Sequence, residues 1–379
     1  MRSTWGLGFV LSLAAACGGS DTPATTSMDM TMGKTSTPLN YFGSGSPGDV
    51  WQFTIDRGLG TFTGKSDGGK PSDPTAAFTV GGTVETTGST FLKLTVTSFT
   101  GAGQGPTMNG VDNVGYALEI PSVALLIKPQ GNSPMIAAVY KGDCTALSGA
   151  GFGWVRTGFG SKQFNVETED VYGSVTLNGN STAPGIENGN GFSITGTQLT
   201  GDGTAHPFDG KGTGTCTDGV ISFPNGVTGV ATQTSGGLMI LDQGQGQGGI
   251  VVMGHASLTA DQFTGRSYSG FVFHNNSNQT DAIKVTFDST GSGDVKPYTD
   301  LVAGTLGASV VTISNVAGQS DGSVKVNVGS SGDGARGFAT AVSDPSMAGI
   351  NHYIMVLVAQ DSDGMAPLNI VLIEEPGHT

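Results

Sequence analysis

Short runs of apolar or alternating residues, separated by clusters of glycine, asparagine, aspartate and serine, fill the chain from residue 48 onward. A run recurs about every ten to fifteen residues, which is the length of one strand with its turn. Examples are DVWQFTID, TFLKLTVTSF, SVALLIKP, SGFVFHNN and SVKVNVGS. Dipeptides such as Asp321-Gly322 and Asp333-Gly334 favour tight hairpins between runs. The pattern predicts an all-β fold of antiparallel barrel or sandwich modules, without βαβ units.

Composition agrees with this interpretation. The 379 residues include 64 glycines and only 12% charged residues, and both glycine and β-branched residues disfavour helices. Helical signals are sparse: we expect one or two turns at residues 299–306, and Asp344-Pro345 could cap another short helix. A net charge of −14 argues against nucleic-acid binding, which requires a basic surface.

The first residues, MRSTWGLGFVLSLAAAC, combine one arginine, an apolar stretch and three small residues before Cys17, which is typical of a secretory signal. The segment LAAAC resembles the lipobox of bacterial lipoproteins, although Ala14 occupies the position where that family carries a large apolar residue. The resemblance implies that residues 1–16 are removed and that Cys17 carries acyl chains as a membrane anchor. Gly18, in place of the aspartate of lipoproteins kept in the inner membrane, implies the outer membrane, on its periplasmic face or at the cell surface.

Residues 17–48 have no periodic apolar pattern, so we expect the lipidated cysteine to be followed by a flexible tether rich in serine, threonine, glycine and proline. The alternation of apolar and polar residues is also lost in the segment SGGLMILDQGQGQGG, which suggests a domain boundary there. We therefore expect two β domains, 49–240 and 241–379. The similar hexapeptides TFTGKS, at 61–66, and QFTGRS, at 262–267, hint that the two are related.

Two cysteines remain once Cys17 is acylated. Cys144 and Cys216 form an even pair in a compartment that permits disulfides, so we predict one bridge between them; two separate buried thiols are the alternative. Neither has a histidine within a few residues, so a zinc site has little support.

Two sequence motifs match nucleotide-binding or hydrolase patterns but lack the required context. Gly244, Gly246 and Gly249 match a dinucleotide fingerprint, yet IVVMG follows where a helix must begin. Ser66 and Ser320 each sit in G-x-S-x-G, but the strand–turn–helix context of a nucleophile elbow is missing. We expect all three segments to be loops or turns.

Acidic and histidine positions give no stronger candidate. Glu167 and Glu169 alternate with apolar residues and fit a solvated strand face better than a glycosidase pair, and Glu374 and Glu375 would point to opposite faces of a strand. The DSDG at residues 361–364 is a turn that lacks most of a calcium loop. The histidines lack ligand spacing; they are His206, His255, His274, His352 and His378.

These observations favour a lipid-anchored envelope or cell-surface protein with a binding or structural role. We predict no catalytic residue, cofactor or metal, and as partners the membrane, through the anchor, and an unidentified ligand or envelope protein. Trp51 and Trp154 are expected in the core, or otherwise in an aromatic binding patch. The alternative is an envelope hydrolase that acts on polysaccharide with carboxylates gathered from separate strands.

Overall fold

The computed structural model contains β-strands and turns, and no helix occurs among the residues that it describes. None of its described segments could therefore cross a membrane as a long apolar helix. The all-β prediction is confirmed. The described residues are 37–45, 49–67, 77–101, 113–129, 135–140, 151–157, 170–178, 191–200, 204–207, 213–217, 219–222, 228–231, 238–242, 249–254, 263–274, 279–318, 323–328, 334–343, 351–360 and 367–375.

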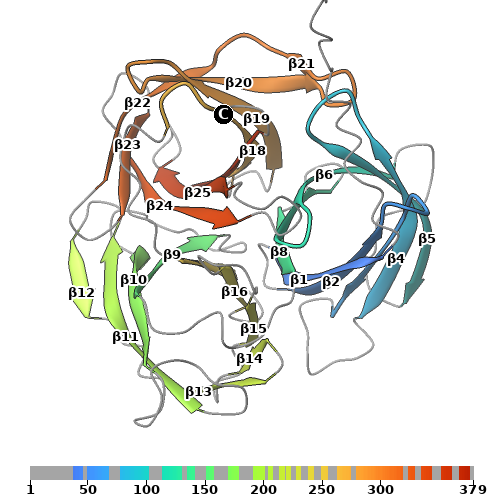
Figure 1. Cartoon of the computed structure of the whole chain (residues 1–379), viewed down its shortest axis with the longest axis horizontal. Helices are drawn as coiled ribbons and strands as arrows, with labels where there is room; N and C mark the ends of the chain where they lie inside the picture. The colour runs from blue at the N-terminus through green and yellow to red at the C-terminus, as the bar shows by residue number, and fades with distance from the viewer. Residues whose placement is uncertain are drawn as a thin grey trace, which may run out of the picture. The chain divides into compact units, whose positions relative to one another are not determined.

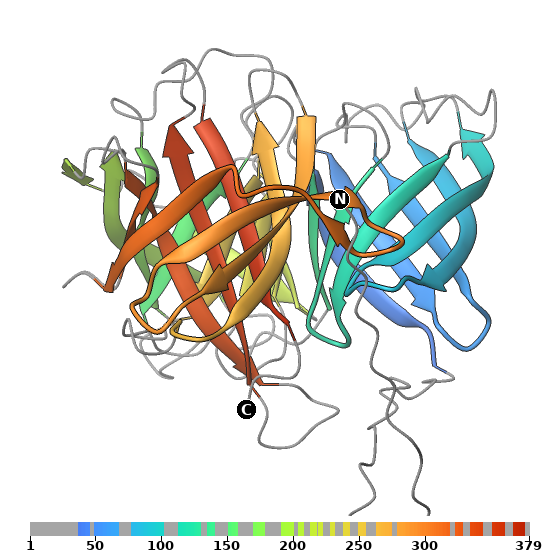
Figure 2. The same cartoon turned by 90° about the horizontal axis from the view of Figure 1, so that it is seen from above.

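The first sheet is a closed antiparallel barrel in which each strand pairs with its neighbours in sequence and β8 closes on β1 (Figure 1). Figure 2 shows these strands from another side, inclined to one another as barrel closure requires. The strands are β1 (Leu39–Gly45), β2 (Val50–Asp56), β3 (Thr61–Ser66), β4 (Phe78–Thr86), β5 (Leu92–Gly101), β6 (Val114–Ile120), β7 (Ala124–Lys128) and β8 (Ile136–Tyr140).

The second sheet also closes into a ring, because β10 pairs with β11 and β17 pairs with β9. Short strand β12 pairs with β11 beside this ring. The strands are β9 (Gly151–Thr157), β10 (Asp170–Asn178), β11 (Gly191–Thr200), β12 (Ala205–Pro207), β13 (Thr213–Thr217), β14 (Val220–Ser222), β15 (Thr228–Ala231), β16 (Leu238–Asp242) and β17 (Gly249–Gly254).

The third sheet repeats this order: β19 pairs with β20, β26 closes on β18, and short strand β21 pairs with β20 beside the ring. Its strands are β18 (Ser267–His274), β19 (Gln279–Phe287), β20 (Gly293–Asp300), β21 (Thr305–Leu306), β22 (Val311–Gly318), β23 (Val324–Val328), β24 (Gly334–Ser343), β25 (Asn351–Gln360) and β26 (Pro367–Glu374).

The strand pairing differs from the expected division at 240/241. That position falls inside β16, which pairs with both β15 and β17, so the described strands form three rings and not two modules. The tether is also shorter than expected, because β1 lies within residues 17–48. The alternation of apolar and polar residues determines which face of a strand is buried, but it does not determine which strands pair to close a ring.

Two local expectations are corrected. TFTGKS forms the whole of β3, whereas Phe263 to Arg266 of QFTGRS lie before β18, so the two hexapeptides are not equivalent. Residues 299–306 form the β20–β21 hairpin instead of a helix. Asp300 Oδ1 accepts hydrogen bonds from the backbone N–H groups of Val302 and Ala303, at 2.8 and 2.9 Å, which stabilises a turn that competes with a helix.

Apolar side chains fill the first and third rings. In the first ring, the cluster includes Tyr41, Phe53 and Leu125, and alternate residues of β3 are buried as the pattern predicts. The third ring contains a separate cluster that includes Phe287 and Leu357. Both interiors are therefore packed cores.

A further apolar cluster joins side chains on the outer faces of the sheets. Ala124 and Leu126 of β7 belong to it together with Val155 of β9 and Phe338 of β24. Strands β7, β24 and β26 consequently have consecutive buried residues, on both of their faces. Gly153 leaves room for the Phe338 ring, because a Cβ there would lie 2.0 Å from a ring carbon.

Candidate functional site

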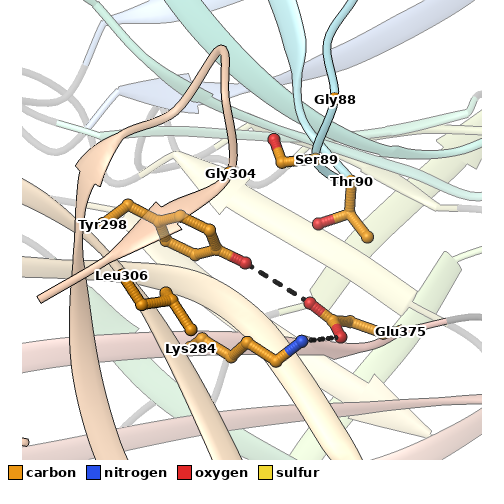
Figure 3. Close-up of a pocket in the computed structure, with 8 residues that line it drawn as sticks. All are labelled: Gly88, Ser89, Thr90, Lys284, Tyr298, Gly304, Leu306 and Glu375. Atoms are coloured by element: carbon orange, nitrogen blue, oxygen red, sulfur yellow. Dashed lines mark hydrogen bonds and ion pairs between the residues drawn. The ribbon is translucent and has the colours of Figure 1, made fainter. Parts of the chain in front are cut away.

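A polar pocket lies where the β4–β5 turn meets the third sheet (Figure 3). Its volume is about 250 Å³. The β4–β5 turn contributes one wall, and β19, β20, the β20–β21 hairpin and the residue after β26 contribute the others. The lining residues are Gly88, Ser89, Thr90, Lys284, Tyr298, Gly304, Leu306 and Glu375.

Hydrogen bonds between main chains and side chains hold the β4–β5 turn in place. Gly88 N donates to Val302 O at 2.8 Å, and Ser89 Oγ donates to Leu301 O at 2.7 Å. Inside the turn, Thr87 Oγ1 donates to the carbonyl of Phe91 at 2.7 Å. The β4–β5 turn is thus attached to two backbone carbonyls of the β20–β21 hairpin, which gives this wall of the pocket a defined position.

Aromatic packing supports the same contact from below the turn. The centroid of the Phe91 ring lies 5.1 Å from that of the Tyr298 ring, in an edge-to-face arrangement, and 5.4 Å from that of the Phe271 ring. Such pairs add about 0.5–1.5 kcal/mol to the effect of burial alone. On the opposite side, Gly304 has a φ of +71°, and a Cβ there would lie 3.4 Å from Ser89 Cβ, so a glycine suits both the backbone and the space.

Glu375 is the centre of the pocket's polar network. Lys284 Nζ lies 2.5 Å from Glu375 Oε2, and Tyr298 donates to Glu375 Oε1 at 3.4 Å (Figure 3). The Ser269 hydroxyl donates to the same oxygen, Glu375 Oε1, at 2.5 Å. The Lys284 and Glu375 side chains are 26% and 12% exposed, so solvent reaches the ion pair only in part. Burial and the nearby charge of Glu375 raise the pKa of Tyr298, while the hydrogen bond with Ser269 opposes the rise. The phenol therefore keeps its proton at neutral pH.

The arrangement is suited to binding. Lys284 has N–H groups beyond the one that faces Glu375, and the hydroxyls of Thr90 and Tyr298 can donate or accept. The two glycines allow the β4–β5 turn and the β20–β21 hairpin to approach each other, because a Cβ at Gly88 would lie 3.1 Å from Val302 O. Of the lining residues, the sequence drew attention only to Glu375, in the adjacent pair with Glu374, because the others are scattered from position 88 onward and belong to no motif.

A second polar cluster lies in the first sheet at the start of β2. Trp51 Nε1 donates to Asp49 Oδ2, and Ser66 Oγ donates to the same oxygen at 3.2 Å. Burial raises the pKa of Asp49 to about 6, the negative charge of Asp67 adds to the rise, and the hydrogen bonds from Trp51 and Ser66 oppose it. Asp67 is close by because its Oδ1 accepts from Val50 N at 2.9 Å.

A third network has a structural role in the first sheet. The Arg57 guanidinium donates to Glu119 Oε2 through two nitrogens, at 2.5 and 2.9 Å, and Tyr41 donates to the other oxygen of Glu119. Burial and the charge of Glu119 raise the pKa of Tyr41. Because each charged group has a partner of opposite sign, the buried charges are compensated and the network offers no open site.

The structure places the predicted turn motifs as follows. Gly249 opens β17, which pairs antiparallel with β16, so no helix follows the glycines; Gly244 and Gly246 lie outside the described residues. The expected turn at Ser66 is wrong, because Ser66 is the last residue of strand β3; its side chain is buried, unlike that of an exposed nucleophile. Ser320 lies outside the described residues.

The acidic pairs have different outcomes. Glu374 binds Arg266 and accepts a hydrogen bond from Tyr353 N, whereas its neighbour Glu375 faces the pocket. Glu167, Glu169 and residues 361–364 lie outside the described part of the chain.

The histidines are dispersed. His206 is exposed in β12, His352 is buried in β25, and His274 Nε2 lies 3.2 Å from Asp281 Oδ2; His255 and His378 are not among the described residues. Across the described ranges, no three histidine, cysteine, aspartate or glutamate side chains gather as metal ligands.

Trp51 and Trp154 are both buried, in β2 and β9, as core residues. Cys216 is buried in β13 and is disulfide-bonded. Cys144 and the lipidation candidate Cys17 lie outside the described residues, so the Cys144–Cys216 pairing and the acylation of Cys17 stay predictions.

Comparisons with known proteins give little further guidance. No family model and no curated sequence matches this chain. Similar solved structures include a mutant of the vaccine antigen Transferrin Binding Protein B from Haemophilus parasuis Hp5, with 11% identity over 89% of this chain and 76% of that one, and a TM-score of 0.24. Another is isotype 1 of that protein from serogroup B Neisseria meningitidis, with 10% identity, 87% and 66% coverage and a TM-score of 0.20. TM-scores this low support no inference about this chain.

Proposed function

We propose that this chain is a lipid-anchored protein of the outer membrane that binds a small ligand in the polar pocket. The observation that carries the proposal is the pocket itself, in which an ion pair, several hydroxyls and two glycines converge from separate elements. Apolar clusters occupy the first and third rings, whereas the polar pocket lies outside both clusters, at the contact between the β4–β5 turn and the third sheet.

The pocket can be tested by thermal unfolding of the full chain in detergent with sugars, amino acids and small carboxylates. A ligand at a hundredfold excess over its Kd stabilises the folded state by about 2.7 kcal/mol, which raises the melting temperature by several degrees. Leu306→Trp fills the pocket and should abolish the rise, whereas Val310→Trp, at a position 67% exposed, should not. An equal rise in Leu306→Trp would place the ligand elsewhere.

The anchor gives a second expected result. Cys17→Ser removes the thiol that would carry the acyl chains, so the protein should move from the membrane fraction to the soluble fraction after cell disruption. Immunoblots of both fractions measure the change. Ser20→Ala serves as the control because it changes a residue of the same segment and keeps the Cys17 thiol, so it should leave the protein in the membrane fraction. Retention of Cys17→Ser in the membrane would contradict the anchor.

A second candidate function is polysaccharide hydrolysis, and Asp49 is the observation that favours it. Asp49 precedes β2 and Asp67 follows β3, so two strands bring two carboxyl groups into one neighbourhood. Burial raises the pKa of Asp49 first and the charge of Asp67 raises it further, which is an environment that can suit a general acid.

A further inference from the structure

Charge in the polar pocket is balanced. Lys284 and Glu375 are the only charged side chains among the described residues that line it, and their atoms lie 2.5 Å apart. A charged ligand would displace water from this site without finding an opposite charge that is free to pair with it. A neutral ligand avoids this cost.

The hydrogen-bonding groups require a ligand that can both donate and accept. Lys284 supplies donors, the carboxylate of Glu375 supplies acceptors, and the hydroxyl of Thr90 can act as either. A ligand hydroxyl also has both capacities, so a ligand with several hydroxyls can match a mixed lining of this kind. Lys284, Ser269 and Tyr298 already donate to Glu375, and because a carboxylate oxygen can accept more than one hydrogen bond, Glu375 can also accept from a ligand hydroxyl.

Shape limits the ligand to one ring. The volume of about 250 Å³ lies below the 300–1,000 Å³ of pockets that hold drug-sized molecules. The Leu306 side chain and the Tyr298 ring add apolar surface between the polar groups (Figure 3). Such a surface suits the C–H groups of a ring whose edge carries hydroxyls.

We infer that the polar pocket binds one neutral, hydroxyl-rich ring of the chemical class of a sugar unit, a statement that rests on the proposed function of the pocket. Glucose, glucuronate and glucosamine test it because they share one ring and differ in charge. Isothermal titration of the full chain in detergent should show glucose binding about tenfold more tightly than either charged analogue.

Glu375→Gln provides the decisive variant. It keeps the shape of the side chain and removes the charge that balances Lys284, so the preference should change to glucuronate by about tenfold. Glu85→Gln is the matched control, because Glu85 pairs with Lys93 at 3.4 Å outside the pocket lining, and its preference should remain that of the natural chain. Thr90→Val removes one hydroxyl from the pocket lining while keeping the shape of the side chain, so it should weaken glucose binding about fivefold. This second variant tests the inference if Glu375→Gln does not fold.

The outcomes separate the two proposals. If none of the sugars, amino acids and small carboxylates of the thermal-unfolding test raises the melting temperature, the proposed binding function of the pocket fails. If an amino acid or carboxylate binds and Leu306→Trp blocks it, while glucose does not bind, the pocket is a binding site and the inference about its ligand is overturned. Glucose binding that Thr90→Val and Leu306→Trp leave unchanged would also overturn it.

Discussion

Gly337→Ala should lower the melting temperature by about 5 °C or more, whereas Gly334→Ala, three residues earlier on β24, should leave it nearly unchanged. A Cβ at residue 337 would lie 1.9 Å from Val356 O and 2.8 Å from Leu357 Cα. Both atoms belong to the backbone of β25, which pairs with β24 at this point, so no side-chain rotation relieves the overlap. The strands would have to separate, at a cost of about 3 kcal/mol.

Gly334 is a matched control because the substitution, the strand and the sheet are the same. The nearest atoms to a Cβ at residue 334 are Lys325 Cε at 3.4 Å and Val326 O at 3.6 Å, which are ordinary contacts. Differential scanning calorimetry of the two variants measures the difference. Equal changes in melting temperature would show that the close approach of β24 and β25 is not what requires glycine.

Glycine has the same role where two rings close. A Cβ at Gly43 would lie 1.9 Å from Ala137 O, across the β1–β8 pair, and one at Gly270 would lie 2.0 Å from Val371 O, across the β18–β26 pair. From the sequence, the glycines indicated only turns and the absence of helices. Their part in bringing strands together could not be predicted, because it depends on which strands are neighbours.

Strand positions could be predicted because alternation is a local property. DVWQFTID became β2 and SVALLIKP became β7, whose Leu125 faces the ring interior and whose Leu126 joins the outer cluster. Ring closure and the polar pocket depend on residues far apart in sequence. Ser89 and Leu301, whose hydrogen bond fixes one wall of the pocket, are separated by 212 positions. No window of sequence contains that information.

Asp49→Asn should make the protein more stable than the natural chain by about 3 kcal/mol at pH 8, and the gain should nearly vanish at pH 4. The ordinary pKa of this carboxyl is 3.8, and burial raises it to about 6 in the folded protein. Below 3.8 the group is protonated in both states. Between 3.8 and 6 the unfolded chain releases the proton while the folded protein keeps it, so stability falls as pH rises through this window. Above 6 the folded protein carries a buried charge that asparagine does not have.

Urea unfolding of both proteins from pH 4 to pH 8 measures this difference in stability. Asp49→Asn is a suitable variant because its amide retains an oxygen that can accept hydrogen bonds from Trp51 and Ser66. Asp294→Asn, at an exposed position of β20, is the matched control for the loss of one carboxylate outside the core. A constant difference between the Asp49 variant and the natural chain would contradict burial as the cause of the raised pKa. The same variant addresses the second candidate function: release of reducing ends from envelope polysaccharide by the natural chain, lost in Asp49→Asn, would favour hydrolysis, since a proton donor at this position cannot be replaced by an amide.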